Sequence, residues 1–418
     1  MGFILKYLLE KALRGFNKKF FLVFILAGLV ISAGNKNSEL EPGRMPMMFG
    51  VVFTPEVNGR ELNAQIQDLK DLGVDFAKFW LDWREIEPVL AFHLSWEDFS
   101  THPEIIDEYA FPEKPGSRFK GQLNYSRTDR LIQELNSAGI SPIPLIADGA
   151  MSPGVSSSNP EQRIAPEQIG FSCQTRVAGE TRTYVGIGRE QYLAQVYLLS
   201  AGLARRYSHP GMMVEWWNTE NELNWTYIHT SVAGWRCGKA WSDKQFLTDL
   251  LHTLYLGVKM GNPQAKATMN VNIHDPNWLN DLKLWSRDMD ALGLGAYPNY
   301  LFPIPKMDWI LTDAVRKAVA RASGKPVFIL ETGYPSGPKN LGWNEKLQAE
   351  YISESISGAV KNRANAYIYF KLDDTDLKIS PVNLQKVENH WGLVRLNGTR
   401  KPAFFAYQDA VKKFSQSR

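Results

Sequence analysis

The sequence has few cysteines and no large excess of charge of either sign. Two cysteines occur in 418 residues, and Lys plus Arg number 47 against 44 acidic residues. The first count excludes a disulfide-dense scaffold, and the second leaves no basic surface of the kind that binds nucleic acid. The apolar fraction of 44% is that of an ordinary globular protein. We therefore expect a large folded body with no nucleic-acid partner.

The sequence also lacks the short motifs that mark nucleotide, metal and serine enzymes. No P-loop, G-x-S-x-G motif or catalytic Cys–His signature occurs, and the seven histidines show no H-x-H or H-E-x-x-H spacing. Phosphate binding, serine hydrolysis and zinc binding depend on such patterns. We therefore expect neither a metal nor a cofactor.

The amino terminus has the pattern of a targeting segment. Lys18 and Lys19 precede residues 20–33, which are all apolar or small. Fourteen such residues suit the apolar core of a signal peptide and are short for a membrane span of about 20 residues. We expect residues 1–34 to be a signal peptide or an uncleaved signal anchor, and residues 35–46 a linker. The body would then be exported (periplasmic, extracellular or anchored facing outward), with residues 20–33 as its membrane contact if they are not removed.

Cys173 and Cys237 both fall in long connections between predicted elements. In an exported protein they can form one disulfide, but two buried free thiols fit the sequence nearly as well.

Apolar runs alternate with amphipathic stretches over residues 47–415. The predicted strands are 47–53, 75–81, 141–147, 212–217, 265–271, 291–295, 326–331 and 366–371. The predicted helices are 61–72, 128–138, 189–207, 243–261, 276–289, 309–322, 345–361 and 402–414. Eight βα units predict a single closed (β/α)8 barrel. An open doubly wound sheet is the competing fold, but no G-x-G-x-x-G follows the first strand.

Two connections are unusually long. They follow the second and third predicted strands, and residues 151–188 are rich in Ser, Pro, Gly and Gln, so we expect loop there. Loops that follow strands build the active-site face of such barrels, so these two should wall a cleft.

Two predicted strands end in a carboxylate. Glu222 follows the fourth strand and Glu331 ends the seventh. Across the mouth of a barrel, these are the two carboxylates that a retaining glycosidase holds about 5 Å apart. The alternative is that both form salt bridges at the rim. Glu220 is a second candidate for the acid, because residues two apart on an extended strand share a face.

The motifs around these residues resemble those of clan A of the glycoside hydrolases, the (β/α)8 families that include cellulases, β-galactosidases and β-xylosidases. Asn221-Glu222 is similar to the Asn-Glu pair on the clan's fourth strand, and E-T-G-Y at 331–334 to its strand-seven motif. Further similar segments are W-R-E-I-E-P at 83–88, G-A-Y-P at 295–298, W-G-L-V at 391–394 and K-P-A at 401–403. The resemblance covers residues 47–415.

The resemblance implies retaining hydrolysis of β-glycosidic bonds in an oligo- or polysaccharide. Glu331 would be the nucleophile and Glu222 the general acid and then base, with its pKa raised while Glu331 is charged. Asn221 would hydrogen-bond the sugar 2-OH, and Tyr297 would orient Glu331. A non-catalytic carbohydrate-binding barrel is the alternative function.

The sequence departs from the clan's pattern at two places. Lys78 stands where the second strand often carries Arg, and Y-F-K-L-D at 369–373 replaces the usual strand-eight Trp. We expect Lys78 to contact substrate. The candidates for a sugar-stacking platform are Trp80, Trp225 and Trp391, each of which also fits packing in the core.

Overall fold

A computed structural model of the chain describes residues 47–90, 93–146, 152–159, 161–177, 180–227, 229–230, 236–298, 308–376 and 387–415. The predicted targeting segment and linker lie outside these residues. Eight parallel strands close into a barrel in the order β1-β11-β10-β9-β8-β7-β3-β2, which confirms the predicted (β/α)8 barrel. The barrel strands are β1 (Met48–Val52), β2 (Phe76–Trp80), β3 (Ser141–Leu145), β7 (Trp216–Asn221), β8 (Lys266–Asn272), β9 (Ala291–Ala296), β10 (Val327–Thr332) and β11 (Ala366–Phe370).

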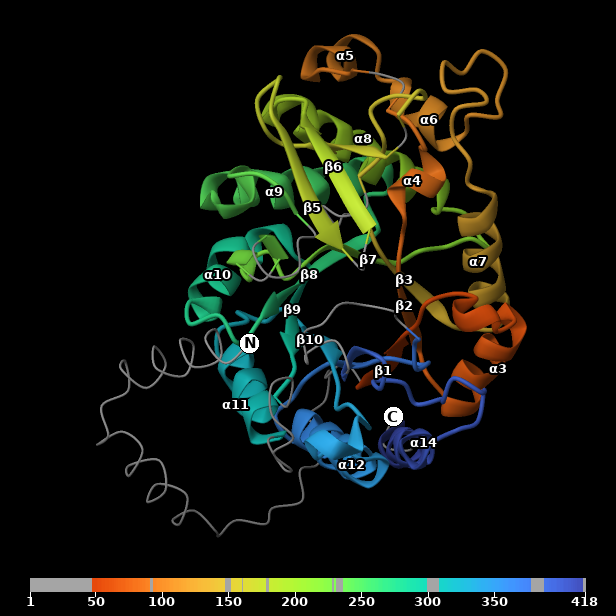
Figure 1. Ribbon diagram of the computed structural model, residues 1–418, viewed down its shortest axis with the longest axis vertical. Coiled ribbons are helices and arrows are strands. Elements are labelled where there is room, and N and C mark those ends of the chain that lie inside the picture. Colours follow the sequence, from red (N-terminus) through yellow and green to blue (C-terminus); the bar gives the residue numbers. More distant parts are fainter. Residues whose placement is uncertain are drawn as a thin grey trace. The chain divides into compact units, whose positions relative to one another are not determined.

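Eight helices surround the strands (Figure 1). They are α3 (Leu62–Leu72), α7 (Ser126–Ser137), α8 (Arg189–Arg206), α9 (Lys244–Gly261), α10 (Trp278–Trp285), α11 (Asp308–Val319), α12 (Glu345–Lys361) and α14 (Pro402–Ser415). Short 3₁₀ helices occupy Val57–Gly59, Ala240–Ser242, Ser286–Asp288 and Lys339–Leu341. None of the helices within the described ranges is long and apolar enough to cross a membrane.

α9 illustrates why these sequences form helices. The Asp243 side chain accepts hydrogen bonds from the backbone N–H groups of Gln245 and Phe246, which caps the first turn. Leu247, Leu251, Leu254 and Val258 recur at helical spacing and are buried. Burial of each such side chain contributes about 2 kcal/mol, so the packed face fixes the helix against the barrel.

The lower interior of the barrel is apolar. Side chains that point inward from several strands form one cluster, in which the Trp216 and Phe328 rings lie 4.6 Å apart. A second, larger cluster fills the space between the strands and the helices. The filled interior confines any substrate to the carboxyl ends of the strands.

The fourth barrel strand lies further along the chain than predicted. We predicted 212–217, whereas β7 spans Trp216–Asn221. The apolar Met212 and Val214 belong to the turn that follows α8, where Val214 N–H donates to the Tyr207 carbonyl. The strand itself carries polar residues that are buried inside the barrel, and a search for apolar runs misses such a strand.

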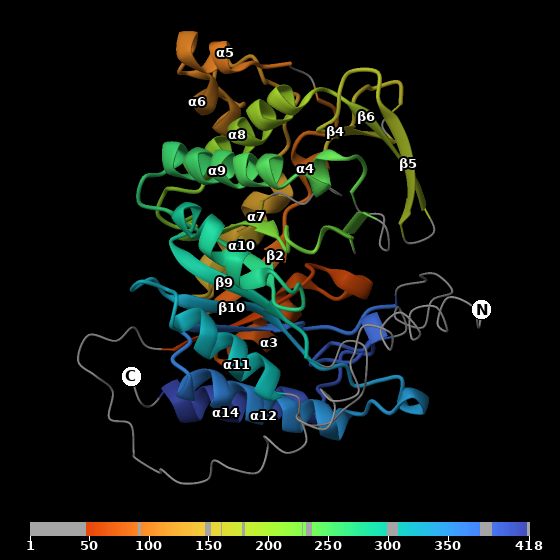
Figure 2. The same ribbon diagram turned by 90° about the vertical axis from the view of Figure 1, so that its left-hand side faces the viewer.

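The prediction of loop over residues 151–188 is wrong. This segment contains a three-stranded sheet in the order β4-β6-β5, formed by β4 (Gln162–Ala165), β5 (Ser172–Val177) and β6 (Glu180–Gly186). β5 alternates exposed and half-buried side chains and has no apolar run, which explains why composition indicated loop. Figure 2 shows the sheet at one side of the molecule, next to α4 (Trp83–Ile86). The other long connection holds α4, α5 (Trp96–Thr101) and α6 (Ile105–Ala110).

The Cys173–Cys237 disulfide is present and joins β5 to the segment that follows β7. Of the two alternatives left open by the sequence, the structure therefore has the bonded one.

Candidate active site

Glu331 faces the barrel interior because β10 is irregular. Ile329 packs outward in the core under the helices, and Leu330 packs inward in the interior cluster. Regular alternation would turn Glu331 outward again. The register with β9 shifts between Ile329 and Glu331, however, so two successive side chains lie on the inner side. Irregularities of this kind often re-aim a side chain beside an active site.

Both carboxylate oxygens of Glu331 are hydrogen-bonded. Lys78 Nζ donates to Oε1 at 2.7 Å, and the Tyr297 hydroxyl donates to Oε2 at 2.8 Å. Glu331 is 3% exposed and Lys78 is fully buried. Such charge-assisted bonds fix the carboxylate in orientation and favour its ionised form. The Lys78 ammonium lies against Glu331, and its contact with substrate stays a prediction.

Glu222 lies immediately beyond the end of β7, in the left-handed backbone region with φ of 50°. Its N–H donates to the Asn270 carbonyl, and its carbonyl accepts from Trp225 N–H. A Cβ at Gly295 on β9 would lie 2.4 Å from Glu222 Oε1, so the carboxyl group occupies the space left by a missing side chain. The His229 ring nitrogen Nε2 lies 3.9 Å from Oε2. Oε1 has no hydrogen-bond partner within the described part of the chain.

Burial raises the pKa of both carboxyl groups. At Glu331 this rise is opposed by the Lys78 charge and by the hydrogen bonds from Lys78 and Tyr297, while the Glu222 charge adds to it. At Glu222 the opposing groups are the Asn272 amide and more distant cations. Burial, rather than the charge of Glu331, is the largest cause of the raised pKa of Glu222.

Glu220 forms an ion pair with Arg236 and not with a residue of the Glu222–Glu331 pair. Its Oε2 accepts from Arg236 Nη2 at 2.7 Å, and both side chains are buried. The expectation that Glu220 and Glu222 share a face assumed one extended strand. β7 instead ends at Asn221, and its register with β8 shifts between Asn218 and Asn221. The structure thus brings Glu222, and not Glu220, against Gly295.

An aromatic wall borders Glu331. The Tyr297 ring lies 5.8 Å from Phe370 and 5.4 Å from Trp391, and Trp80 lies 6.1 Å from Phe370. Trp80 is half-buried and keeps part of its face accessible. Trp391 is fully buried behind Tyr297, so it packs the wall and does not offer the predicted stacking surface.

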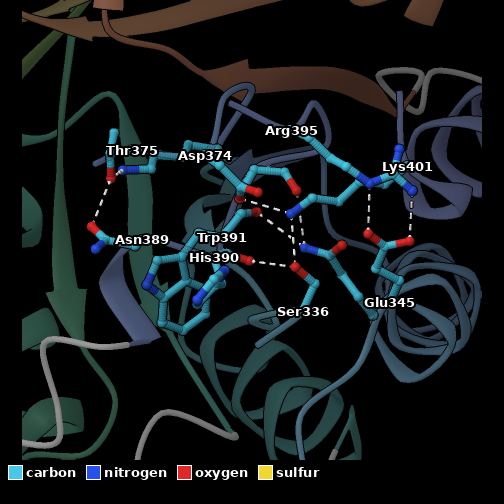
Figure 3. Close-up of polar contacts among 12 residues, drawn as sticks. Ser336, Glu345, Asp374, Thr375, Asn389, His390, Trp391, Arg395 and Lys401 are labelled. Atoms are coloured by element: carbon cyan, nitrogen blue, oxygen red, sulfur yellow. Dashed lines mark hydrogen bonds and ion pairs between the residues drawn. The ribbon is translucent and has the colours of Figure 1, made fainter. Parts of the chain in front are cut away.

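A polar cluster holds the Trp391 segment in place (Figure 3). Lys401 Nζ donates to Asp374 Oδ1 and to Ser336 Oγ, both at 2.7 Å. Asp374 also accepts from the Gly392 N–H, next to Trp391 in the chain. Ser336 Oγ donates to the His390 carbonyl, on the other side of Trp391. The cluster thereby fixes the back of the aromatic wall.

The remaining predicted residues, Asn221 and Trp225, lie at the end of β7 and shortly after it. Asn221 is 9% exposed, and its side-chain Oδ1 has no partner in the described ranges. Trp225 is half-buried, with its ring 6.3 Å from that of His274. His274 in turn contacts the Tyr297 carbonyl at 3.0 Å.

Sequence reasoning missed several residues of the site, namely His229, Gly295, Arg236, Asn270 and Phe370. Only Gly295 carried a usable signal, since a glycine at the carboxyl end of a strand suggests close approach of another group. Within the described ranges, no group of three or more His, Cys, Asp or Glu side chains is arranged to hold a metal ion.

Comparison with known proteins gives a match in structure and none in sequence. No protein-family model matches the chain, and no curated protein matches its sequence. The solved structures that resemble it include an exo-β-1,4-mannosidase from Opitutaceae bacterium strain TAV5, with a TM-score of 0.59 and 14% identity over 89% of this chain and 60% of that one. They also include a GH5_18 protein from Streptomyces cattleya in complex with GlcNAc, with a TM-score of 0.57 and 14% identity over 90% and 82% of the two chains.

A family 39 glycoside hydrolase from Bacteroides cellulosilyticus is similar as well, with a TM-score of 0.55 and 12% identity over 88% of this chain and 63% of the other. The chain spans less than two thirds of the length of this protein and of the mannosidase. These likenesses establish that the chain has the (β/α)8 fold found in clan A glycoside hydrolases.

Proposed function

We propose that this protein is a glycoside hydrolase that cleaves β-glycosidic bonds with retention of anomeric configuration. The observation that carries the proposal is the unequal environment of two buried carboxyl groups at one end of the barrel. Glu331 accepts hydrogen bonds from Lys78 and Tyr297, which favour its anion, and burial raises the pKa of Glu222. An ionised nucleophile and a protonated acid are the two groups that a retaining glycosidase needs.

In the first step Glu331 attacks the anomeric carbon, and Glu222 gives its proton to the departing glycosidic oxygen. The product is a glycosyl ester of Glu331, and the aglycone leaves as an alcohol. Formation of the ester removes the negative charge of Glu331, so the pKa of Glu222 falls and its carboxylate can accept a proton. A water molecule then gives a proton to Glu222 and its hydroxyl to the anomeric carbon, which frees Glu331.

Asn221 is suited to bind the sugar 2-OH, since its unpartnered Oδ1 is buried at the same end of β7 as Glu222. The half-buried face of Trp80 offers a surface for a sugar ring. The structurally similar proteins include an exo-β-1,4-mannosidase and a GH5_18 variant in complex with Manβ1-4GlcNAc. β-Mannosides are therefore the first substrates to test.

The test compares residues 35–418 with the Glu331→Gln variant on aryl β-glycosides and β-linked polysaccharides. We expect turnover by the wild type and a loss of about 10⁴-fold or more in the variant, since the nucleophile is removed while the shape is kept. Equal turnover by both proteins contradicts the assignment of Glu331. Glycan binding without turnover by either protein indicates the non-catalytic binding barrel instead.

We also propose that the protein is exported, with residues 20–33 as a signal peptide or anchor. The disulfide supports this location, because such bonds persist in oxidising compartments. Amino-terminal sequencing of the exported protein tests it: a start near Asn35 indicates a cleaved signal, and an intact Met1 indicates an anchor. Recovery of all the protein in the cytoplasm contradicts export.

A further inference from the structure

Arg236 is a buried cation in the segment that follows β7, and it contacts the residue before Glu222. Its side chain is 1% exposed, and Nη2 donates both to Glu220 Oε2 at 2.7 Å and to the Asn221 carbonyl at 3.2 Å. Glu220 Oε2 also accepts from the Asn221 N–H at 2.8 Å. Arg236 and Glu220 together therefore hold both backbone polar groups of Asn221.

These contacts of Arg236 and Glu220 with Asn221 lie next to a strained point of the chain. Glu222 has φ of 50°, a strained backbone conformation for a non-glycine residue that persists only when the surroundings enforce it. The fixed peptide of Asn221 on one side and the Glu222 N–H···Asn270 carbonyl bond on the other supply that enforcement. The orientation of the Glu222 carboxyl group follows from the orientation of this turn.

Arg236 is itself anchored to the sheet inserted after β3. Cys237 is bonded to Cys173 on β5, and Glu167, which precedes β5, accepts from the Ala240 N–H at 2.6 Å. Gly238 makes the approach possible, because a Cβ there would lie 2.6 Å from the Glu167 carboxyl group. The Arg236 guanidinium carbon lies 4.9 Å from the centre of the buried Trp241 ring. The segment from Arg236 to Trp241 is thus fixed on both sides.

We propose that Arg236 is a positioning residue, which sets Asn221 and Glu222 for the reaction and is held in place by the Cys173–Cys237 disulfide and Glu167. The inference rests on the proposed function. It gives the inserted sheet a role in catalysis without contact between the sheet and the substrate.

The test measures kcat, KM and the pH profile of kcat/KM for Arg236→Gln and Arg236→Lys on an aryl β-glycoside. The charged or titratable groups near Glu222 are Lys78, Glu220, Arg236, His229, His274 and Glu331. Arg236 lowers the pKa of Glu222, so we expect Arg236→Gln to move the basic limb of the profile to higher pH. We expect kcat to fall about 10- to 100-fold with KM nearly unchanged, because the groups are misplaced and the binding surface is kept. Arg236→Lys keeps the charge and should lower kcat while the limb stays in place.

Two further variants separate positioning from general destabilisation. Arg206→Gln breaks a half-buried Arg–carboxylate pair with Asp129, which makes no contact with the described residues of the candidate site, and should leave kcat and the basic limb of kcat/KM unchanged. The double variant Cys173→Ser/Cys237→Ser should lower kcat several-fold while circular dichroism shows a folded protein. A kcat equal to that of the wild type in this variant contradicts the tethering role.

The outcomes distinguish this inference from the proposed function. An active wild type whose pH profile and kcat are unchanged by Arg236→Gln overturns the role of Arg236 and leaves the glycosidase assignment intact. A wild type without turnover on the whole substrate panel overturns the proposed function, and the positioning role with it.

Discussion

Glu331 and Glu222 lie at the same end of one barrel, on strands separated by β8 and β9, but their carboxyl groups are held in different ways. Both oxygens of Glu331 accept hydrogen bonds, one of them from a buried ammonium. Glu222 has one oxygen without a partner in the described ranges, and the other lies 3.9 Å from a histidine nitrogen. Burial is similar at the two residues, so hydrogen bonding and charge make the difference.

In the proposed mechanism, this difference lets one fold hold two carboxyl groups in opposite protonation states. Donors on both oxygens stabilise the anion and fix the direction from which Glu331 can attack. A buried carboxyl group with fewer donors favours its neutral form and can keep a proton to transfer. If this comparison is correct, substitutions around each residue should affect different parts of the reaction.

Apart from loss of the nucleophile itself, the largest expected effect is that of Glu222→Gln. Without a proton donor, kcat for glycosides with poor leaving groups should fall about 10²- to 10⁴-fold. Dinitrophenyl glycosides need no protonation of the leaving group, so the rate of the first chemical step on them should be nearly unchanged. Burst kinetics on both substrate types measure this contrast. Glu220→Gln is the matched control, and a dependence on the leaving group in that variant instead would assign the acid to Glu220.

The next largest effect is expected for Lys78→Met, which should lower kcat by about 10- to 100-fold. Lys78 lowers the pKa of Glu331, so its removal raises that pKa, and the acidic limb of kcat/KM should move to higher pH. Lys401→Met removes another buried Lys–carboxylate pair, which supports the aromatic wall without contacting Glu331. It should lower the melting temperature without moving the acidic limb of kcat/KM. If the acidic limb of the kcat/KM profile moves equally in both variants, or in neither, the role given to Lys78 is contradicted.

Gly295→Ala should have a smaller effect, of about tenfold on kcat. The added methyl group would lie 2.4 Å from Glu222 Oε1 and must displace that carboxyl group. Glu331 is held by other partners, so activity on dinitrophenyl glycosides should be affected less than activity on alkyl glycosides. Equal losses on both would indicate general disruption of the barrel instead.

The barrel could be predicted from the sequence because seven of its strands are short apolar runs between amphipathic helices. The fourth strand was misplaced since its inward residues, Asn218 and Glu220, are polar and buried beside the site. The inserted sheet was missed for a related reason, because β5 is short, polar and half-exposed. Hydrophobic periodicity fails where buried polar groups or exposed strands replace the usual pattern.

The two carboxylates could be predicted because motif and strand position coincide. Their surroundings could not be predicted, since they depend on contacts between distant segments. Arg236 reaches Glu220 across 16 residues, and Lys78 reaches Glu331 across 253. The choice between Glu220 and Glu222 depended on a left-handed residue and a register shift, neither of which leaves a mark on a single sequence.

The most direct test of the central claim is to trap the glycosyl-enzyme. The wild type is incubated with a 2-deoxy-2-fluoro β-glycoside that carries a good leaving group, and the labelled peptide is then identified by mass spectrometry. The account predicts one sugar per chain, bound as an ester to Glu331. A label on Glu222 or Glu220, or turnover of natural glycosides to products of inverted anomeric configuration with no trapped adduct, would contradict it.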